Sequence, residues 1–226
     1  FPHTCVLCAE RANQPRDLCS DCEKELPWAS LACKQCGLRI PASATSAICG
    51  QCQISAPAFN YVFALCDYEE PIDRLITAAK FNHQLVYTRL LGELIAQKAQ
   101  QNWYKQQPMP DLLLPVPLHH TRLRERGYNQ ALEIAKYAAK KLKMSLGKQY
   151  CKRIKATLPQ SSLAHNERDQ NVKDAFVLQK PLSVKHVAII DDIITTGHTV
   201  DEMSKTLRQA GVERIDIWCC ARTQWK

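Results

Sequence analysis

The apolar and polar positions after residue 60 predict a regular succession of strands and helices. Short apolar or β-branched runs predict strands at six positions: 61–68, 111–117, 150–154, 176–178, 187–190 and 214–220. Apolar residues spaced three or four apart predict helices over about 71–80, 84–105, 129–142 and 199–209. Strands that alternate with helices favour an α/β fold, in which helices cover both faces of a parallel sheet.

The first 52 residues lack this alternation and carry paired cysteines instead. Four Cys-x-x-Cys pairs occur there: Cys5/Cys8, Cys19/Cys22, Cys33/Cys36 and Cys49/Cys52. Two such pairs supply four thiolates for one tetrahedral zinc ion (Zn²⁺), so we expect two structural zinc sites that replace a hydrophobic core. Disulfides are one alternative, but they need an oxidising compartment, and four tandem thioredoxin-type sites would lack their βαβ context. Sequential pairing is the default, and interleaved pairing remains its alternative.

Composition divides the chain in the same way. The segment 53–58 resembles a linker, so we expect a double zinc-ribbon module over residues 1–56 and an α/β domain over residues 57–226. The net charge of +8 belongs to the second part, because residues 1–60 are formally neutral. This excess suits phosphorylated ligands or nucleic acid, although charge also serves solubility. There is neither a signal-peptide pattern nor an apolar stretch of the roughly 18 residues that a membrane span needs. We therefore expect a cytoplasmic protein without a membrane span.

The segment from Val187 to Thr199 carries the most specific chemistry. Asp191 and Asp192 follow an apolar run, and carboxylates accept the hydroxyls of a ribose diol and order a magnesium ion (Mg²⁺) through its waters. The turn that follows contains Gly197 and precedes a helix, whose free N–H groups favour an anion. Threonine hydroxyls add donors to this turn. The segment therefore predicts a site for a sugar that carries a phosphate; the alternative is a strand, an Asx-type turn and a capped helix.

This segment resembles the phosphoribosyl-pyrophosphate (PRPP) motif of type I phosphoribosyltransferases at every position. The resemblance implies that PRPP is bound with Mg²⁺, and that Asp191 and Asp192 are the candidate catalytic residues. The candidate PRPP-binding residues are Asp191, Asp192, Ile193, Thr195, Thr196, Gly197, His198 and Thr199. Active enzymes and non-catalytic relatives share the motif, so it indicates a ligand better than a reaction.

Basic residues near the predicted strand ends are candidates to hold a pyrophosphate or a nucleic-acid backbone. They are Lys80, Arg122, Arg124, Arg126, Arg153, Lys155 and Arg168. Loops that leave the carboxyl ends of parallel strands share one crevice, so residues far apart in sequence can meet there. The long polar segment 152–172 predicts a lid, with a mobile surface loop as the alternative. Solvated charge is the alternative for the arginines, and His119 and His120 are either proton shuttles or solvent-facing.

Together these features are similar to the ComF family, also called the competence-protein or GntX group, along nearly the whole chain. The agreeing parts are the cysteine pairs, Lys80-Phe81, the block 115–131, the spacing from Gln160 to Phe176, and the motif at 191–199. The resemblance implies a type I phosphoribosyltransferase-like α/β domain, with helices on both faces of its parallel sheet, preceded by a small double zinc ribbon.

The family resemblance also implies a function. It implies PRPP binding and a role in natural transformation, in which incoming single-stranded DNA is handled in the cytoplasm. DNA-uptake or recombination proteins are then candidate partners. The alternative is an active phosphoribosyltransferase that transfers phosphoribose from PRPP to an unidentified base or nucleotide and releases pyrophosphate.

Overall fold

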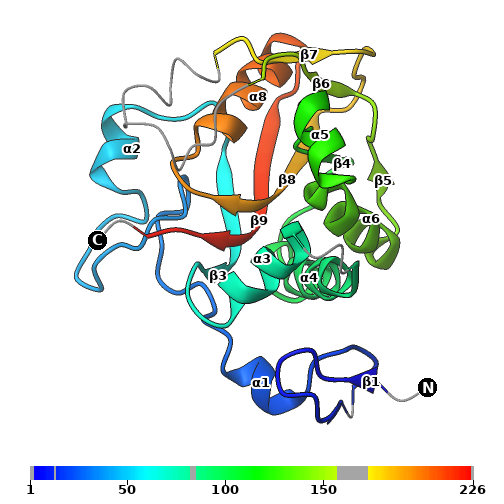
Figure 1. Cartoon of the computed structure of the whole chain (residues 1–226). Coiled ribbons are helices and arrows are strands. Elements are labelled where there is room, and N and C mark those ends of the chain that lie inside the picture. Colours follow the sequence, from blue (N-terminus) through cyan, green and yellow to red (C-terminus); the bar gives the residue numbers. More distant parts are fainter. Residues whose placement is uncertain (1–2, 13, 82–84, 157–172, 225–226) are drawn as a thin grey trace.

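A parallel sheet forms the centre of the molecule (Figure 1). The computed structural model describes residues 3–12, 14–81, 85–156 and 173–224. Within these residues the sheet has five parallel strands, in the order β3 (Tyr61–Asp67), β9 (Arg214–Arg222), β8 (His186–Ile194), β4 (Leu112–Pro115) and β5 (Ser145–Leu146). The predicted parallel sheet is confirmed. The strand β5 was not predicted, because two residues are too short to produce a pattern.

Helices cover both faces of this sheet, as predicted. On one face lie α3 (Ile72–Phe81), α4 (Leu85–Lys98) and α6 (Gln130–Leu142), and α8 (His198–Gln209) lies on the other (Figure 1). Neighbouring residues of β8 contribute to different cores: Ile190 packs in the core of the three helices, and Ile189 packs in the core of α8. A strand that is buried on both faces needs an unbroken apolar run, which is the pattern in the sequence.

Two predicted segments differ from the structure. The helix expected over 84–105 ends as α4 at Lys98 and continues as a π-helical turn, η1 (Ala99–Trp103). The segment that contains Arg122, Arg124 and Arg126, where no helix is predicted, forms the short helix α5 (His120–Arg126). Local capping explains α5: the His119 side chain accepts from the backbone N–H of Thr121, and Gly127 ends the helix at a φ of 75°.

The strands predicted at 150–154 and 176–178 lie outside the central sheet. They form β6 (Cys151–Arg153) and β7 (Phe176–Leu178), an antiparallel pair with Cys151 opposite Leu178. Cys151 and Phe176 are buried in the same core as α8. The pair therefore completes the cover over the second face of the sheet.

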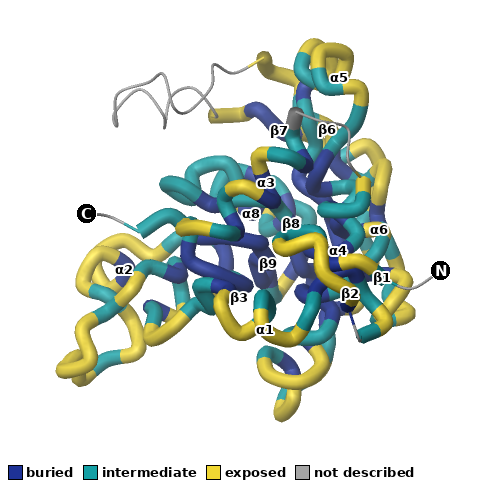
Figure 2. Tube along the Cα trace, turned by 60° about the horizontal axis from the view of Figure 1, so that its bottom comes forward, coloured by how far each residue is buried: buried dark blue, intermediate teal, exposed yellow. Residues whose placement is uncertain are grey.

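The cysteine-rich residues dock on the α/β domain at two separate places. The first part contains β1 (His3–Thr4), β2 (Arg11–Ala12) and α1 (Ser20–Lys24), and the second contains α2 (Gly50–Ile54). Figure 1 shows α1 beneath α4, and α2 near the carboxyl-terminal end of the chain. Between them, the segment 27–29 pairs with the outer edge of β3, where Asp67 N–H donates to Pro27 C=O at 2.8 Å. Many residues in both parts are exposed to solvent (Figure 2).

Candidate functional site

The predicted ligand site lies where β8 extends beyond its neighbour β4. The strand β4 ends at Pro115, opposite Ile190, whereas β8 continues to Ile194 because it stays paired with β9. The strand is therefore longer than the predicted 187–190 and includes both aspartates. Beyond Ile190 one side of β8 has no partner strand among the described residues, and this carboxyl edge of a parallel sheet is where ligands bind in α/β folds.

The two aspartates are held in place by the backbone that follows them. Asp191 Oδ1 accepts from Asp192 N–H at 2.9 Å, and Asp192 Oδ1 accepts from Ile193 N–H at 2.8 Å. Burial, and then the charge of Asp192, raise the pKa of Asp191 well above its usual range, against the opposing effects of the Asp192 N–H and Lys80. A partly buried, mutually repelling carboxylate pair is typical of a functional site, because a cation or hydroxyl ligand would relieve the repulsion.

The turn after β8 has the features of an anion site. Gly197 adopts a φ of 88° and precedes the first residue of α8, and no side chain caps that helix. The helix begins at His198, one residue earlier than predicted. Thr196 Oγ1 is buried and makes no hydrogen bond within the described residues, a costly state that a ligand oxygen would end. A cavity of about 20 Å³ lined by Asp191, Thr195 and Thr199 accepts a single oxygen-sized group at this point.

Two of the predicted basic residues lie at the aspartates. Lys80 Nζ lies 2.9 Å from Asp192 Oδ2, because Tyr128 donates to the carbonyl of Ala79 and ties the end of α3 to this edge. Burial, and then the charge of Arg122, lower the pKa of Arg153, while Asp191 opposes this effect. Lys80 and Arg153 therefore place positive charge beside the carboxylates, and the charge of Arg122 acts on Arg153.

The structure does not bring the other basic candidates to the aspartates. Lys155 is exposed and donates to Lys173 C=O at 2.6 Å. Arg124 is exposed on α5, and Arg126 Nη1 lies 3.3 Å from Gln130 Oε1. Arg168 and residues 157–172 of the predicted lid lie outside the described residues.

The two histidines were predicted to be proton shuttles or solvent-facing. Burial, and then the charges of His120 and Arg153, lower the pKa of His119. Its Nδ1 lies 2.8 Å from Thr121 Oγ1, so this ring faces inward and serves as the cap of α5.

Sequence reasoning missed Arg222. The last strand was expected to end at Cys220, but β9 includes Arg222, which is 2% exposed. Its guanidinium donates to the carbonyls of Ile194 and Thr195, at the start of the turn between β8 and α8. The sequence does contain one signal: Arg222 is a charged residue close behind the apolar run of the predicted last strand, 214–220.

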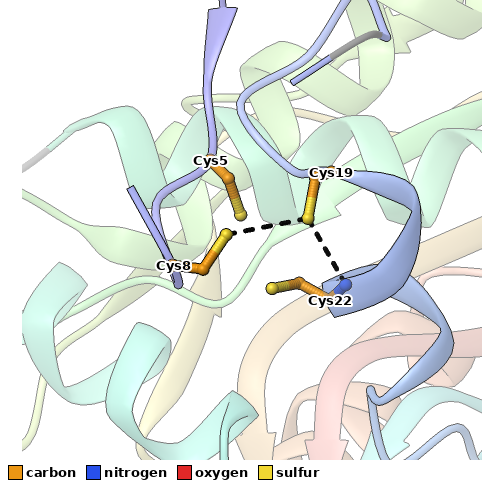
Figure 3. Close-up of side chains that lie close together, drawn as sticks. All are labelled: Cys5, Cys8, Cys19 and Cys22. Carbon is orange, nitrogen blue, oxygen red and sulfur yellow. Dashed lines mark hydrogen bonds between the residues drawn. The ribbon is translucent and has the colours of Figure 1, made fainter. Parts of the chain in front are cut away.

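The eight paired cysteines form two tetrads. Figure 3 shows the first, in which Cys5, Cys8, Cys19 and Cys22 point toward a common centre. The second consists of Cys33, Cys36, Cys49 and Cys52. Sequential pairing is therefore confirmed, and interleaved pairing is excluded.

The spacing of the sulfur atoms fits zinc. Within each tetrad all four lie within 4.8 Å of one another, and the Cys8–Cys19 and Cys36–Cys49 sulfur distances are 3.7 and 3.6 Å. A Zn–S bond of about 2.3 Å sets tetrahedral sulfurs about 3.8 Å apart. Four sulfurs leave no coordination position for water, so these are structural zinc sites.

The architecture defines a class of protein: a parallel α/β domain that follows two structural zinc ribbons. The double zinc ribbon domain family matches residues 1–53. Competence protein F of Haemophilus influenzae is 34% identical over 230 residues, covering 98% of both chains. DNA utilization protein YhgH of Salmonella typhi is 32% identical over 224 residues, also covering 98% of both. This chain therefore belongs to the competence protein F family, the ComF family that the sequence resembles.

Two further findings complete the comparison. A solved purine phosphoribosyltransferase from Pyrococcus horikoshii Ot3 aligns at 18% identity over 71% of this chain and 77% of that chain, with a TM-score of 0.31. In the part of the chain that the structure describes, no helix has the length and apolar character needed to cross a bilayer.

Proposed function

We propose that this protein binds PRPP together with Mg²⁺ at the carboxyl end of β8. We propose further that it acts in natural transformation, where it handles incoming single-stranded DNA in the cytoplasm. The names of its relatives, a competence protein and a DNA utilization protein, support the biological role. The chemical role is supported by the site itself.

The observation that carries the ligand proposal is the aspartate pair beside an uncapped, glycine-containing helix start. The Asp191 and Asp192 carboxylates would accept the two ribose hydroxyls and hold the waters of Mg²⁺. The N–H groups of the turn and the Thr196 hydroxyl would take the 5-phosphate. Lys80 and Arg153 would face the pyrophosphate, which carries the most charge.

Calorimetric titration with PRPP and Mg²⁺ tests this proposal. Asp191→Ala combined with Asp192→Ala should abolish the binding heat and leave two zinc ions per chain. The matched control removes two exposed surface carboxylates, Asp21→Ala with Glu213→Ala, and should bind like the wild type. A wild-type protein that shows no PRPP affinity, or a double aspartate variant that binds normally, would sink the proposal.

A groove on another part of the molecule supports the DNA role. Two adjoining hollows of about 490 and 550 Å³ share Asn102, Trp103 and Gln107, and their linings contain lysines but no carboxylate. Phe63 and Trp103 stack there with their ring centroids 5.4 Å apart, and the partly exposed Tyr61 lies beside them. Aromatic rings next to lysines suit the stacked bases and the phosphates of a single strand.

Salt-dependent DNA binding tests this second part. Fluorescence anisotropy with a labelled single strand should show affinity that falls steeply with salt. Lys34→Gln with Lys105→Gln should reduce the slope of log K against log salt by about 1.4, and Tyr61→Ala should cost ~1–3 kcal/mol. Lys148→Gln with Lys180→Gln, two exposed lysines outside the groove, should reduce binding less. Equal losses in both lysine pairs would remove the groove from the proposal.

The cluster of cations at the aspartates also favours a second candidate, an active phosphoribosyltransferase. In such an enzyme Lys80 and Arg153 would stabilise the charge that grows on departing pyrophosphate. A pyrophosphate-release assay with PRPP, Mg²⁺ and a panel of bases distinguishes the two. Turnover that disappears in the double aspartate variant favours the enzyme, whereas PRPP and DNA binding without turnover favours a binding protein.

A further inference from the structure

Arg222 lies between the second cysteine tetrad and the proposed phosphate-binding turn. Its Nε donates to the carbonyl of Cys36, a ligand of the second zinc site, at 2.9 Å. Its Nη1 donates to the carbonyls of Ile194, at 3.2 Å, and of Thr195. One buried side chain therefore contacts both the metal knuckle and the first residues of the turn.

The charge of Arg222 is balanced in an unusual way. Arg222 forms no ion pair with a carboxylate in the described ranges, although it is almost fully buried, and a buried charge without a partner is strongly unfavourable. It interacts electrostatically with the thiol of Cys219 and, to a lesser extent, with those of Cys36, Cys52 and Cys33 of the second tetrad. Four thiolates around one Zn²⁺ carry a net charge of about −2. A zinc-loaded second tetrad would therefore place negative charge next to Arg222, which contacts it at the carbonyl of Cys36.

The knuckle around Cys36 is also packed tightly against the sheet. Gly37 has a φ of 74°, and a Cβ atom there would lie only 2.8 Å from Val62 Cγ1. Next to it, Gln224 accepts from Arg39 N–H at 2.8 Å and donates to Asp67 Oδ1 at 2.6 Å. Because the knuckle has little freedom to move, its position determines where the Arg222 guanidinium lies.

The first tetrad has a different set of neighbours. Cys5 is buried in the core of α4, and near this tetrad Arg89 of α4 pairs with Asp17 and Arg16 donates to Gln97. These contacts lead to the helical face of the sheet and not to the turn after β8. The two zinc sites are therefore not equivalent with respect to the ligand site.

We infer that Arg222 is a positioning residue that couples the metal state of the second zinc site to the phosphate-binding turn. This inference rests on the proposed PRPP site. Loss of the second zinc removes the negative charge of the tetrad and frees the knuckle, Arg222 releases the carbonyls of Ile194 and Thr195, and the turn loses its fixed geometry. Loss of the first zinc leaves this connection intact.

The test compares four variants of the full chain. Arg222→Gln breaks the connection, Cys36→Ser disables the second tetrad and Cys8→Ser disables the first. Arg208→Gln is the matched control. Arg208 also donates to backbone carbonyls, those of Ala58 and Val212, but neither carbonyl belongs to the turn after β8. Each variant is assayed for zinc content, for hydrogen exchange over residues 193–199, and for affinity toward PRPP with Mg²⁺.

We expect Arg222→Gln and Cys36→Ser to exchange faster over residues 193–199 and to bind PRPP about 10-fold or more weakly. Arg222→Gln should do so while it retains the first zinc. Cys8→Ser and Arg208→Gln should lower the melting temperature without changing hydrogen exchange over residues 193–199 or the affinity for PRPP. If Arg222→Gln does not fold, Arg222→Lys replaces it, since it keeps the charge but cannot reach both groups of carbonyls.

The outcomes separate this inference from the proposed function. A wild type that fails to bind PRPP rejects the ligand, yet the exchange comparison still decides whether Arg222 orders the turn. Normal exchange in Arg222→Gln, or equal loosening of the turn in Cys8→Ser and Cys36→Ser, overturns the coupling even if PRPP binds well.

Discussion

Asp191 is the residue at which the needs of ligand binding and of stability most clearly conflict. Its carboxyl group is partly buried next to Asp192, and desolvation and then the charge of Asp192 raise its pKa. The ionised form that a ribose or Mg²⁺ would require is therefore unfavourable in the unliganded protein. Lys80 offsets part of this cost through its 2.9 Å contact with Asp192. A ligand that brings its own cation and hydroxyl groups would remove the rest.

The affinity for PRPP and Mg²⁺ should fall as the solution is acidified through the raised pKa of Asp191. Below this pKa a proton occupies the carboxylate, so binding must displace it, and affinity drops by up to about 10-fold per pH unit. Calorimetry in buffers of different ionisation enthalpy should detect proton release. The 5-phosphate also titrates near pH 6, so Asp191→Asn is the reference that isolates the aspartate. Identical proton release in both proteins would show that Asp191 plays no part.

Removing the Asp191 charge should stabilise the unliganded protein at neutral pH. A carboxyl group whose pKa is higher in the folded than in the unfolded state binds more protons when folded, so stability declines as pH rises through that window. Asp191→Asn avoids this loss, and each kcal/mol recovered should raise the melting midpoint by ~2–4 °C. Thermal melts of Asp191→Asn and the wild type at pH 7 without ligand measure this difference in midpoint. A lower midpoint than that of the wild type would contradict the assigned environment.

At the scale of elements, the turn between β8 and α8 depends on a backbone conformation that favours glycine. Gly197 and Gly211, at the two ends of the α8 region, share a φ of 88°, and no atom would lie within 4 Å of a Cβ at either position. A side chain at either site therefore meets the same backbone strain and no steric clash. Of these two glycines, Gly197 alone lies in the turn that we propose to bind the phosphate.

Gly197→Ala and Gly211→Ala should each destabilise the fold by ~1–2 kcal/mol, the cost of the left-handed conformation. Gly197→Ala should also weaken PRPP binding by about 10-fold or more, because relief of that strain turns the N–H groups of the helix start away from the phosphate. Urea unfolding and calorimetry give the two quantities. Equal affinities in the two variants would mean that the turn does not hold the phosphate.

Elements with a long, regular pattern could be predicted from sequence, and those defined by tertiary pairing could not. β8 and α8 follow from the apolar run ending at Ile190 and from helical spacing, so the turn between them was predicted, although β8 continues through both aspartates to Ile194. β6 and β7 are short, and nothing local shows whether they join the central sheet or pair with each other. Arg222 escaped because its partners, Cys36 and Thr195, are distant in sequence and offer only backbone carbonyls.

At the scale of the whole molecule, the zinc ribbons are part of the packing of the α/β domain. The first ribbon contributes Leu18 and Leu26 to the core that α4 and α6 form against the sheet. The segment 27–29 covers the outer edge of β3, which would otherwise present unpaired backbone groups. The domain boundary at residue 56 therefore remains a proposal. Residues 1–56 need zinc to fold, but we expect the first ribbon to unfold in the same transition as residues 57–226.

Leu18→Ala tests this cooperative unfolding. Leu18 is fully buried between the first ribbon and α4, so its truncation should cost ~2–5 kcal/mol and lower a single melting transition. Leu31→Ala, in a side chain that is 55% exposed, should stay within about 0.5 kcal/mol of the wild type. Circular dichroism and the fluorescence of the buried Trp218 should report the same midpoint, because the ribbon and the sheet share one core. If the Trp218 signal kept its wild-type midpoint while the ribbon lost its zinc, the two parts would fold independently, and the shared core would add little to the stability of the sheet.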